Sequence, residues 1–258
     1  MHQSHLLFIP VYNCEKQIIR VIDKLLSSDI TKNFREILII DNRSNDKTFE
    51  FVDEYIIKKK IFNFKIVKNK ENYNLGGTHK TGFNYAIKNN FNYVSILHGD
   101  DQGDINDLSK VFDNNIYLNY DCLLGSRFTK KSKLINYPKF RIYANWLINL
   151  AGSLVTFRYL TDLGSGLNMF KVEYIKNKFY LNFPNDLTFN YCLIFYICHS
   201  KSKFIFFPIA WSEDDQISNV KLFNHAFKWL RILLKFIFNR NKLFNNSKLK
   251  NQKYSFED

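Results

Sequence analysis

The chain has 258 residues, of which 46% are hydrophobic and 24% charged, and its formal net charge is +13. These fractions exclude a disordered or collagen-like chain and are those of a globular protein. The excess of Lys and Arg indicates a polyanionic partner, either nucleic acid, an anionic membrane surface or a phosphorylated substrate. Because no RNP sequence or zinc-finger spacing is present, no nucleic acid is expected as a partner. The four cysteines have no metal-site spacing and are expected to be reduced thiols.

Short apolar runs alternate with segments of helical periodicity in the first half of the chain. The pattern predicts strands at residues 5–9, 36–40, 64–67, 93–97 and 122–124, and helices at 15–26, 47–57, 77–88 and 105–114. This alternation indicates an α/β fold with a mostly parallel sheet and helices on both faces. After residue 124 we expect a basic loop at 129–139, a helix at 140–156, a turn at 161–166, a helix at 187–199, a strand at 204–208 and a polar loop at 212–219.

Residues 225–238 have the pattern of an amphipathic helix. Lys228, Arg231 and Lys235 fall on one stripe, and apolar side chains occupy the remainder. The helix either lies in a membrane interface or packs on the core of the domain with its cations outward. We expect the segment after Asn239 to be a solvated tail, and divide the chain into a domain at 1–222 and a basic amphipathic helix with tail at 223–258.

No apolar run is long enough to span a bilayer, and the N-terminal stretch lacks the basic leader of a signal peptide. The expected location is the cytoplasm, peripheral on the inner face of the membrane.

Polar residues follow the predicted strands at their carboxyl ends. Pro10 and Tyr12 follow the first strand, Asp41 the second, residues 69–77 the third, and His98 and Asp100 the fourth. Each group alone could be an ordinary turn, but four groups at one sheet edge favour a ligand site. Neither glycine-rich phosphate fingerprint is present, so side chains and a metal ion would have to hold a bound nucleotide.

The acidic cluster after the fourth strand is the candidate metal site. Asp100 has His98, Asp101 and Asp104 beside it, a composition that suits Mg²⁺ or Mn²⁺. Such an ion would neutralise a diphosphate and improve it as a leaving group. For Asp104 we favour the alternative role of capping the helix that begins near Ile105.

These motifs together resemble those of family 2 glycosyltransferases of the GT-A fold, which is Rossmann-like. The resemblance covers about residues 6–222 and rests on IPVYN at 9–13, IDNRSND at 40–46, NLGG at 74–77 with Lys80 and Gly82, and the Asp100 loop. Later motifs resemble those of the polyprenol-phosphate (dolichol-phosphate) mannose or glucose synthase branch: GSRF at 125–128, Arg141, DLGSG at 162–166, and PIAW at 208–211 followed by Ser218.

For the nucleotide-sugar donor, the resemblance implies that Pro10, Tyr12 and Asp41 hold the nucleoside and that Lys80 approaches the diphosphate. Asp100 would be the metal-binding carboxylate of an Asp-x-Asp motif, the cofactor being Mg²⁺ or Mn²⁺. The chain departs from the family pattern twice, with His98 in place of the first acid of that motif and Asn42 in place of the second acid after Asp41. His98 can still ligate Mn²⁺, or the metal is held differently.

For the acceptor, the resemblance implies that Arg127 and Arg141, with Ser165 and Gly166 of the DLGSG motif, bind an anionic group such as a lipid phosphate. A guanidinium suits that task because its planar fork meets phosphate oxygens in pairs. The alternative for Arg127 is a surface salt bridge.

The implied reaction is an inverting sugar transfer from a nucleotide-sugar to a polyprenyl phosphate or a related lipid-linked acceptor. A phosphate is already ionised and needs no general base. A hydroxyl of a glycan, the alternative acceptor, needs one, and Asp162 is the only candidate. Asp162 could instead have a structural role in its glycine-rich turn. Non-catalytic alternatives are a basic nucleic-acid-binding or membrane-binding module, or a degenerate transferase that acts as a scaffold.

Overall fold

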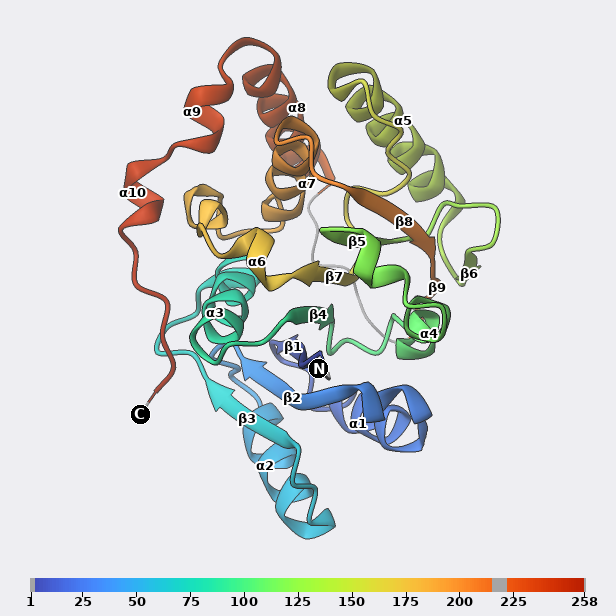
Figure 1. Ribbon diagram of the computed structural model, residues 1–258, viewed down its shortest axis with the longest axis vertical. Helices are drawn as coiled ribbons and strands as arrows, with labels where there is room; N and C mark the ends of the chain where they lie inside the picture. Colours follow the sequence, from blue (N-terminus) through green and yellow to red (C-terminus); the bar gives the residue numbers. More distant parts are fainter. Residues whose placement is uncertain (1–2, 215–221, 258) are drawn as a thin grey trace.

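The computed structural model describes residues 3–214 and 222–257. They form a seven-stranded sheet with the strand order β3-β2-β1-β4-β7-β5-β8, seen from bottom to top in Figure 1. The strands are β1 His5–Val11, β2 Phe34–Asp41, β3 Phe64–Lys68, β4 Tyr93–Leu97, β5 Cys122–Ser126, β7 Leu167–Lys171 and β8 Phe204–Pro208. All pairings are parallel except those of β7, which lies antiparallel between β4 and β5. The expected mostly parallel α/β fold is thus confirmed.

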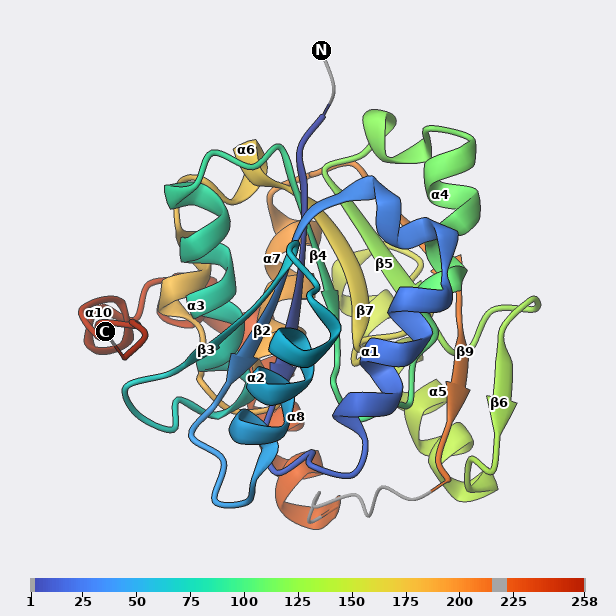
Figure 2. The same cartoon turned by 90° about the horizontal axis from the view of Figure 1, so that it is seen from below.

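Helices cover both faces of the sheet because alternate strand residues are apolar on both sides. Leu7 and Ile9 of β1 pack in one cluster with α1 Ile18–Ser27, α2 Thr48–Lys59 and the turn η2 Ile105–Leu108 with α4 Ser109–Asp113. Leu6 and Phe8 pack in the other cluster with α3 Asn74–Lys88, α6 Val172–Ile175 and α7 Phe189–His199. Figure 2 shows α3 and α1 on opposite sides of the sheet.

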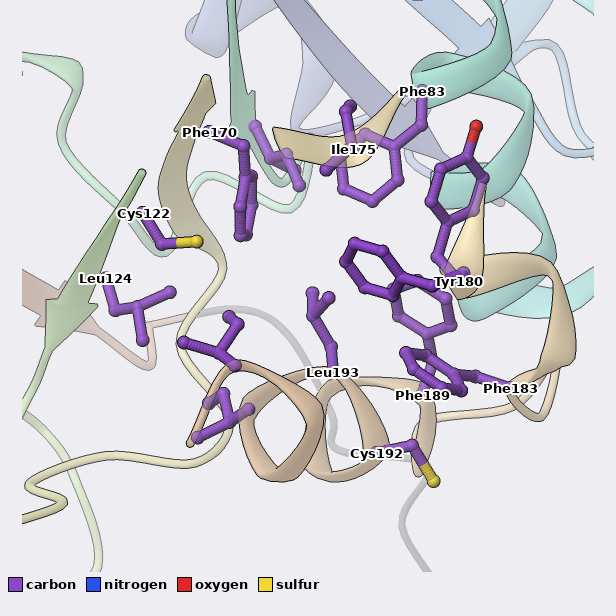
Figure 3. Packing of buried hydrophobic residues seen from close by; sticks show 14 of the residues in the cluster. Phe83, Cys122, Leu124, Phe170, Ile175, Tyr180, Phe183, Phe189, Cys192 and Leu193 are labelled. Carbon is purple, nitrogen blue, oxygen red and sulfur yellow. The ribbon is translucent and has the colours of Figure 1, made fainter. Parts of the chain in front are cut away.

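The second cluster is rich in aromatic rings. Phe83 of α3 lies with its ring centroid 5.0 Å from that of Tyr180 and 5.4 Å from that of Phe170, both in edge-on contact. Figure 3 shows these rings converging with Phe189 above the helix α7. Such contacts add to the burial of apolar area, the main source of stability. They fix α3 and α7 against the sheet, and so position the loops at its carboxyl edge.

The remaining elements lie at the end of the sheet formed by β5 and β8. A small parallel sheet joins β6 Lys133–Ile135 to β9 Ala210–Ser212. The long helix α5 Lys139–Thr156 and the helix α8 Leu222–Phe238 lie close together, at the top of Figure 1. The predicted division at residue 222 stays a prediction, although Ile232, Leu233 and Phe236 of α8 belong to the same core as α7.

The prediction of a solvated tail after Asn239 is wrong. The chain forms α9 Arg240–Phe244 and α10 Ser247–Lys250, and Leu243, Phe244 and Tyr254 are buried. These apolar residues are too irregularly spaced to show a period. They are buried because they pack on helices that precede them in the chain. Leu243 and Phe244 join the core cluster that contains α7 and the turn η4 Phe179–Asn182, and Tyr254 packs on Tyr73 at the start of α3.

We expect His5 to make the fold sensitive to acid. Its ring is buried and stacks on Tyr93 at 4.9 Å, and burial lowers the pKa of His5 to about 4. The unfolded chain binds this proton at a higher pH than the folded chain, so stability is lost as the pH falls from about 6.5 towards 4. The loss attributable to His5 is about 3 kcal/mol.

The measurement is the free energy of unfolding by urea at pH 7, 5.5 and 4.5 for the wild type and His5→Phe, which keeps the ring contacts. The variant should lose less stability in acid. Equal losses in both proteins would contradict this role for His5.

Candidate active site

The carboxyl ends of β1, β2 and β4 lie side by side. Val11 pairs with Asp41 in parallel register, and the amide of Asn42 donates to the carbonyl oxygen of Val11 at 2.9 Å. On the other side of β1, the amide of Gly99 donates to the carbonyl oxygen of Pro10 at 3.2 Å. The segments that carry Pro10, Asp41 and Asp100 therefore leave three neighbouring strands at one sheet edge.

The thiol of Cys14 lies behind this edge and is affected by its charges. Burial is the main cause that raises the pKa of Cys14 to about 12, and the carboxylates of Asp100, Asp46 and Asp41 each add to the rise. Hydrogen bonds join the loop of Cys14 to the loop that follows Asp41: the amide of Cys14 donates to the hydroxyl of Thr48 at 2.9 Å, and the amide of Glu15 donates to Oδ2 of Asp46 at 3.3 Å.

Asp41 and Tyr12 are the two residues predicted to hold the nucleoside. The carboxylate of Asp41 is buried, accepts hydrogen bonds from the amide of Ser44 at 3.2 Å and from the Ser44 hydroxyl, and has a pKa raised by burial. The ring of Tyr12 is 41% exposed, and its hydroxyl accepts from Asn45 at 3.3 Å. A fixed acceptor beside an open aromatic face suits a planar base with N–H donors.

Asn42, which replaces the usual second acid, joins the ends of β2 and β3. Its Oδ1 accepts from the amide of Tyr73 at 2.9 Å and from Nδ2 of Asn69 at 3.1 Å. Its Nδ2 donates to Oδ1 of Asn72 at 2.9 Å. A carboxylate could not make the last of these bonds, because it has no donor. The substitution thus ties the loop after β3 to the loop that carries Asp41.

The acids after β4 have different roles. Asp101 adopts a left-handed backbone conformation (φ 62°), and its carboxylate pairs with Arg20 at 2.8 Å and Lys24 at 2.6 Å on α1. Asp104 caps the following turn by accepting from the amide of Asn106 at 2.9 Å, the role that we favoured for it. Asp100 is therefore the acid of this group whose carboxylate, among the described residues, neither pairs with α1 nor caps the following turn.

His98 and Asp100 are the candidate metal ligands, and their donor atoms have few other hydrogen-bond partners. Nε2 of His98 is buried and has no hydrogen-bond partner among the described residues, and the described bond to the Asp100 carboxylate is from the amide of Gln102 at 3.3 Å. Burial lowers the pKa of His98, which keeps its ring neutral, and raises the pKa of Asp100. Within residues 3–214 and 222–257 no set of three His, Cys, Asp or Glu side chains could hold an ion. Diphosphate and water oxygens would have to complete the coordination.

Arg127 and Asp162 form a buried ion pair. Nε and Nη2 of Arg127 donate to the two carboxylate oxygens at 2.7 and 2.8 Å, and the amides of Arg127 and Gly164 donate to the same oxygens at 3.0 and 2.9 Å. The pair is therefore internal and not the surface salt bridge considered above. The guanidinium also lies 5.2 Å from the ring centroid of Trp211.

Of the other predicted acceptor residues, Arg141 lies over the same ring as Arg127, with the two guanidinium groups 4.9 and 5.9 Å from the ring centroid of Tyr137. Arg141 on α5 donates from Nη1 to both carboxylate oxygens of Glu213, at 2.7 and 2.6 Å. Ser165 is buried, and its hydroxyl bonds to the backbone of Leu167. Gly166 packs against the ring of His98, which joins this region to the candidate metal ligands. Ser218 lies outside the described residues.

Lys80 is placed away from these groups. It is fully buried on α3, and its Nζ donates to the carbonyl oxygen of Phe183 at 2.5 Å, to Oδ1 of Asn185 at 2.7 Å and to the hydroxyl of Tyr254 at 3.0 Å. Burial lowers the pKa of Lys80 to about 7. Because the ammonium is already surrounded by oxygens inside the fold, we do not include Lys80 in the donor site.

The model of the glycosyl transferase family 2 matches residues 7–179, which carry both sets of site residues up to Gly166. The chain belongs to this family. It is 27% identical over 180 residues to the UDP-N-acetylglucosamine–dolichyl-phosphate N-acetylglucosaminyltransferase of Methanococcus voltae, a match that covers 66% of this chain and 70% of that protein.

Solved structures show the same fold. TarS 1–349 of Staphylococcus aureus in complex with UDP-GlcNAc superposes with a TM-score of 0.59 at 18% identity, covering 92% of this chain and 67% of that one. Glucosyl-3-phosphoglycerate synthase of Mycobacterium tuberculosis, in complex with Mn²⁺, UDP and glucosyl-3-phosphoglycerate, gives a TM-score of 0.59 at 12% identity, covering 92% and 80%. The chain is a glycosyltransferase with the GT-A fold.

In this glycosyltransferase, Gly166 has no room for a side chain. A Cβ atom there would lie 2.7 Å from Nδ1 of His98 and 3.1 Å from the Trp211 ring. We expect Gly166→Ala to displace His98 and to lower kcat/KM by about 10²-fold, the usual cost of misplacing a reacting group by about 1 Å. The measurement is the rate of sugar transfer.

Gly103→Ala is the matched control, because a Cβ there would make only ordinary contacts, 3.4 Å from Leu97 and 3.7 Å from Trp211. Similar rates for the two variants would contradict the tight packing of Gly166 on His98.

Trp211 is a site residue that sequence reasoning did not single out. Its ring packs on both Gly166 and the Arg127 guanidinium, so it links the candidate metal ligands to the buried ion pair. Its Nε1 is buried without a partner among the residues that the structure describes. The sequence signal for this residue was its place in the PIAW motif at 208–211.

Proposed function

We propose that this glycosyltransferase moves a sugar from a nucleoside diphosphate to a polyprenyl phosphate, such as dolichyl phosphate, at a membrane surface and with inversion at the anomeric carbon. The relative from Methanococcus voltae is named as a transferase that acts on dolichyl phosphate. Solved relatives bind UDP-GlcNAc, or UDP with Mn²⁺, which supports a nucleotide-sugar donor for this chain.

The hydrogen bonds and ion pair of Asp162 are the observation that favours a phosphate acceptor. Both of its oxygens accept hydrogen bonds, and a buried guanidinium opposes its negative charge. Each carboxylate oxygen accepts two hydrogen bonds, from Arg127 and Gly164, and the side chain is fully buried, so no lone pair of Asp162 is directed at a substrate hydroxyl. Asp162 was the only candidate base for a hydroxyl acceptor. An acceptor that is already ionised needs no base.

The reaction is a single in-line displacement. A phosphate oxygen of the acceptor forms a bond to the anomeric carbon while the bond from that carbon to the donor diphosphate breaks, and the electron pair leaves with the nucleoside diphosphate. Asp41 and Tyr12 hold the nucleoside. Arg127, whose Nη1 has no hydrogen bond within the described residues, and Arg141 attract and orient the acceptor phosphate.

His98 and Asp100 would hold Mg²⁺ or Mn²⁺ together with diphosphate oxygens. The chemistry that this ion supplies is neutralisation of the charge on the leaving group. A neutral imidazole is a better ligand for Mn²⁺ than for Mg²⁺, so we expect Mn²⁺ to be the more effective ion.

The helices α5 and α8 supply the proposed membrane surface. Large apolar side chains of both helices are exposed: Phe140, Tyr143, Trp146, Leu147, Leu150 and Leu154 on α5, and Phe227, Leu230, Leu234, Ile237 and Phe238 on α8. Neither helix contains an acidic residue, and Lys228, Arg231 and Lys235 lie on α8. Exposed apolar area with basic residues suits an anionic lipid surface. Among the described residues, no helix is long and apolar enough to cross a bilayer.

This surface extends the prediction for residues 225–238. The core-packing alternative considered for that helix applies to Ile232, Leu233 and Phe236, whereas the exposed Phe227 and Phe238 are available for the proposed contact with lipid. We propose a peripheral location on the cytoplasmic face of the membrane.

We expect the double substitution Leu147→Glu/Leu150→Glu to weaken binding to vesicles by at least about tenfold. Each leucine is more than half exposed, and burying one such side chain contributes about 1.5 kcal/mol or more. The measurement is co-sedimentation with vesicles of neutral lipid containing anionic lipid. The control is Phe62→Glu, an exposed ring on the turn between α2 and β3. Unchanged sedimentation of the double variant would refute the surface.

The acceptor is tested by incubating the enzyme and Mn²⁺ with UDP-, GDP- or dTDP-sugars and either a polyprenyl phosphate or the matching polyprenol. Transfer to the phosphate alone, with inverted anomeric configuration in the product, is the expected result. Transfer to the alcohol or to a glycan hydroxyl, with none to the phosphate, would overturn the proposal and favour the glycan-acceptor alternative.

A further inference from the structure

The last described residues return to the edge of the sheet. The amide of Lys70 donates to the carbonyl oxygen of Ser255 at 3.0 Å, and the amide of Glu257 donates to that of Lys68 at 2.8 Å. Between them, Asn69 forms an antiparallel bridge with Phe256. In Figure 1 the chain after α10 passes α3 on its way to β3. Residues 252–257, here called the terminal segment, thus pair with the chain just after the end of β3.

A buried contact anchors the terminal segment. The hydroxyl of Tyr254 accepts from Nζ of Lys80 at 3.0 Å and donates to Oδ1 of Asn185 at 2.8 Å, and its ring lies 5.3 Å from that of Tyr73. Lys80 is fully buried, so its amine must find hydrogen-bond partners inside the fold, and the hydroxyl of Tyr254 is one of them. The need to satisfy this buried amine therefore holds Tyr254 in place.

The contacts of the terminal segment lead directly to the nucleoside residues. The loop that it braces carries Asn69 and Tyr73, and both donate to Oδ1 of Asn42, the neighbour of Asp41. Glu257 forms an ion pair with Arg43, the next residue along. Two independent contacts thus join the terminal segment to the turn that follows β2.

We propose that the terminal segment is a positioning element of the donor site, which holds the turn after Asp41 and the loop after β3 in the shape that binds the nucleoside. The inference rests on the proposed nucleotide-sugar donor. Tyr254 and Lys80 are positioning residues, because they act through Tyr73 and Asn42 and not on the nucleotide itself. Sequence position gives no sign of this role, since more than two hundred residues separate Tyr254 from Asp41.

The test compares the wild type with a chain that lacks residues 252–258, with Tyr254→Phe, and with the control Lys253→Ala, whose side chain is exposed within the same segment. Calorimetry measures the Kd of UDP, GDP and dTDP with Mn²⁺, and transfer assays give the KM for donor and acceptor. Hydrogen exchange reports the protection of the amides of residues 68–73.

The shortened chain should bind the preferred nucleoside diphosphate at least about tenfold more weakly, equivalent to about 1.4 kcal/mol. Tyr254→Phe should show a smaller loss in the same direction. Donor KM should rise while acceptor KM stays within about twofold, and residues 68–73 should lose protection. Lys253→Ala should match the wild type. If the shortened chain does not fold, the comparison of Tyr254→Phe with the wild type is the test.

Unchanged donor binding in Tyr254→Phe and the shortened chain, with a wild type that does bind a nucleoside diphosphate, would overturn this inference and leave the proposed function intact. Equal increases of donor and acceptor KM would also overturn it, because they would indicate general loss of structure. Failure of the wild type to bind any of the three nucleotides would overturn the proposed function, and this inference with it.

Discussion

Replacing Asp100 with Asn should lower kcat/KM for sugar transfer by about 10³-fold or more. Among the described residues, Asp100 is the acid after β4 that forms neither an ion pair nor a cap, and Nε2 of His98, two residues earlier, has no hydrogen-bond partner there. Neutralising a departing diphosphate is worth several kcal/mol in the transition state, and each 1.4 kcal/mol is a factor of ten in rate. The measurement is the initial rate at saturating Mn²⁺ and at low donor concentration.

Asp101→Asn is the matched control for this prediction. It removes the same charge one residue away, but Asp101 pairs with Arg20 and Lys24 on the surface of α1. We expect its rate to stay within a few fold of the wild type. A large loss in Asp101→Asn and little loss in Asp100→Asn would mean that the ion is bound by the other acid.

Arg127→Met should reduce the free energy of unfolding by about 3–5 kcal/mol. The substitution leaves the fully buried carboxylate of Asp162 without its counter-ion, and removing one partner of a buried pair costs about this much. The measurement is urea unfolding at pH 7. Because the loss comes from an unpaired charge, the double variant Arg127→Met/Asp162→Asn should recover part of the stability.

Arg141→Met is the control, because its partner Glu213 lies in a more exposed pair with side-chain exposures of 20% and 12%. Pairs nearer the surface contribute about 1 kcal/mol or less. If Arg127→Met and Arg141→Met cost the same, or if the double variant is less stable than Arg127→Met, the buried pair does not have the role described.

The sequence predicts the edge of the sheet well because the relevant signals are local. An apolar run followed by Asp41, or by His98 and Asp100, identifies a strand and its end without knowledge of distant residues. The parallel arrangement follows from the alternation of strands and helices, and the sheet pairings of β1 with β2 and β4 confirm it. The prediction that Asp104 caps a helix succeeded for the same reason.

The sequence predicts less where a residue's role depends on what packs against it from far along the chain. The position of Lys80 in its motif places it near a diphosphate, yet its ammonium is surrounded by oxygens of Phe183, Asn185 and Tyr254, more than a hundred residues away. The placement of β7 between β4 and β5 likewise depends on pairings across long connections.

Neighbouring residues of one kind also mislead sequence reasoning. Asp100 and Asp101 are adjacent residues of the same type, so the sequence cannot tell their roles apart. The left-handed backbone at Asp101 turns its carboxylate to α1. The motif predicts Arg127 as an acceptor residue but gives no sign of its pairing with Asp162, which needs the glycine-rich turn to fold back on β5. Such choices are made by backbone geometry, which short motifs do not encode.

Calorimetric titration of a nucleoside diphosphate, with and without Mn²⁺, tests most directly whether Asp41 and Asp100 serve one site. In the wild type, Mn²⁺ should tighten binding by about tenfold or more. Asp41→Asn should weaken binding in both conditions but keep the gain from Mn²⁺, whereas Asp100→Asn should abolish that gain. Nucleotide binding that is indifferent to Mn²⁺ and to both substitutions would contradict a shared donor site at the ends of β2 and β4.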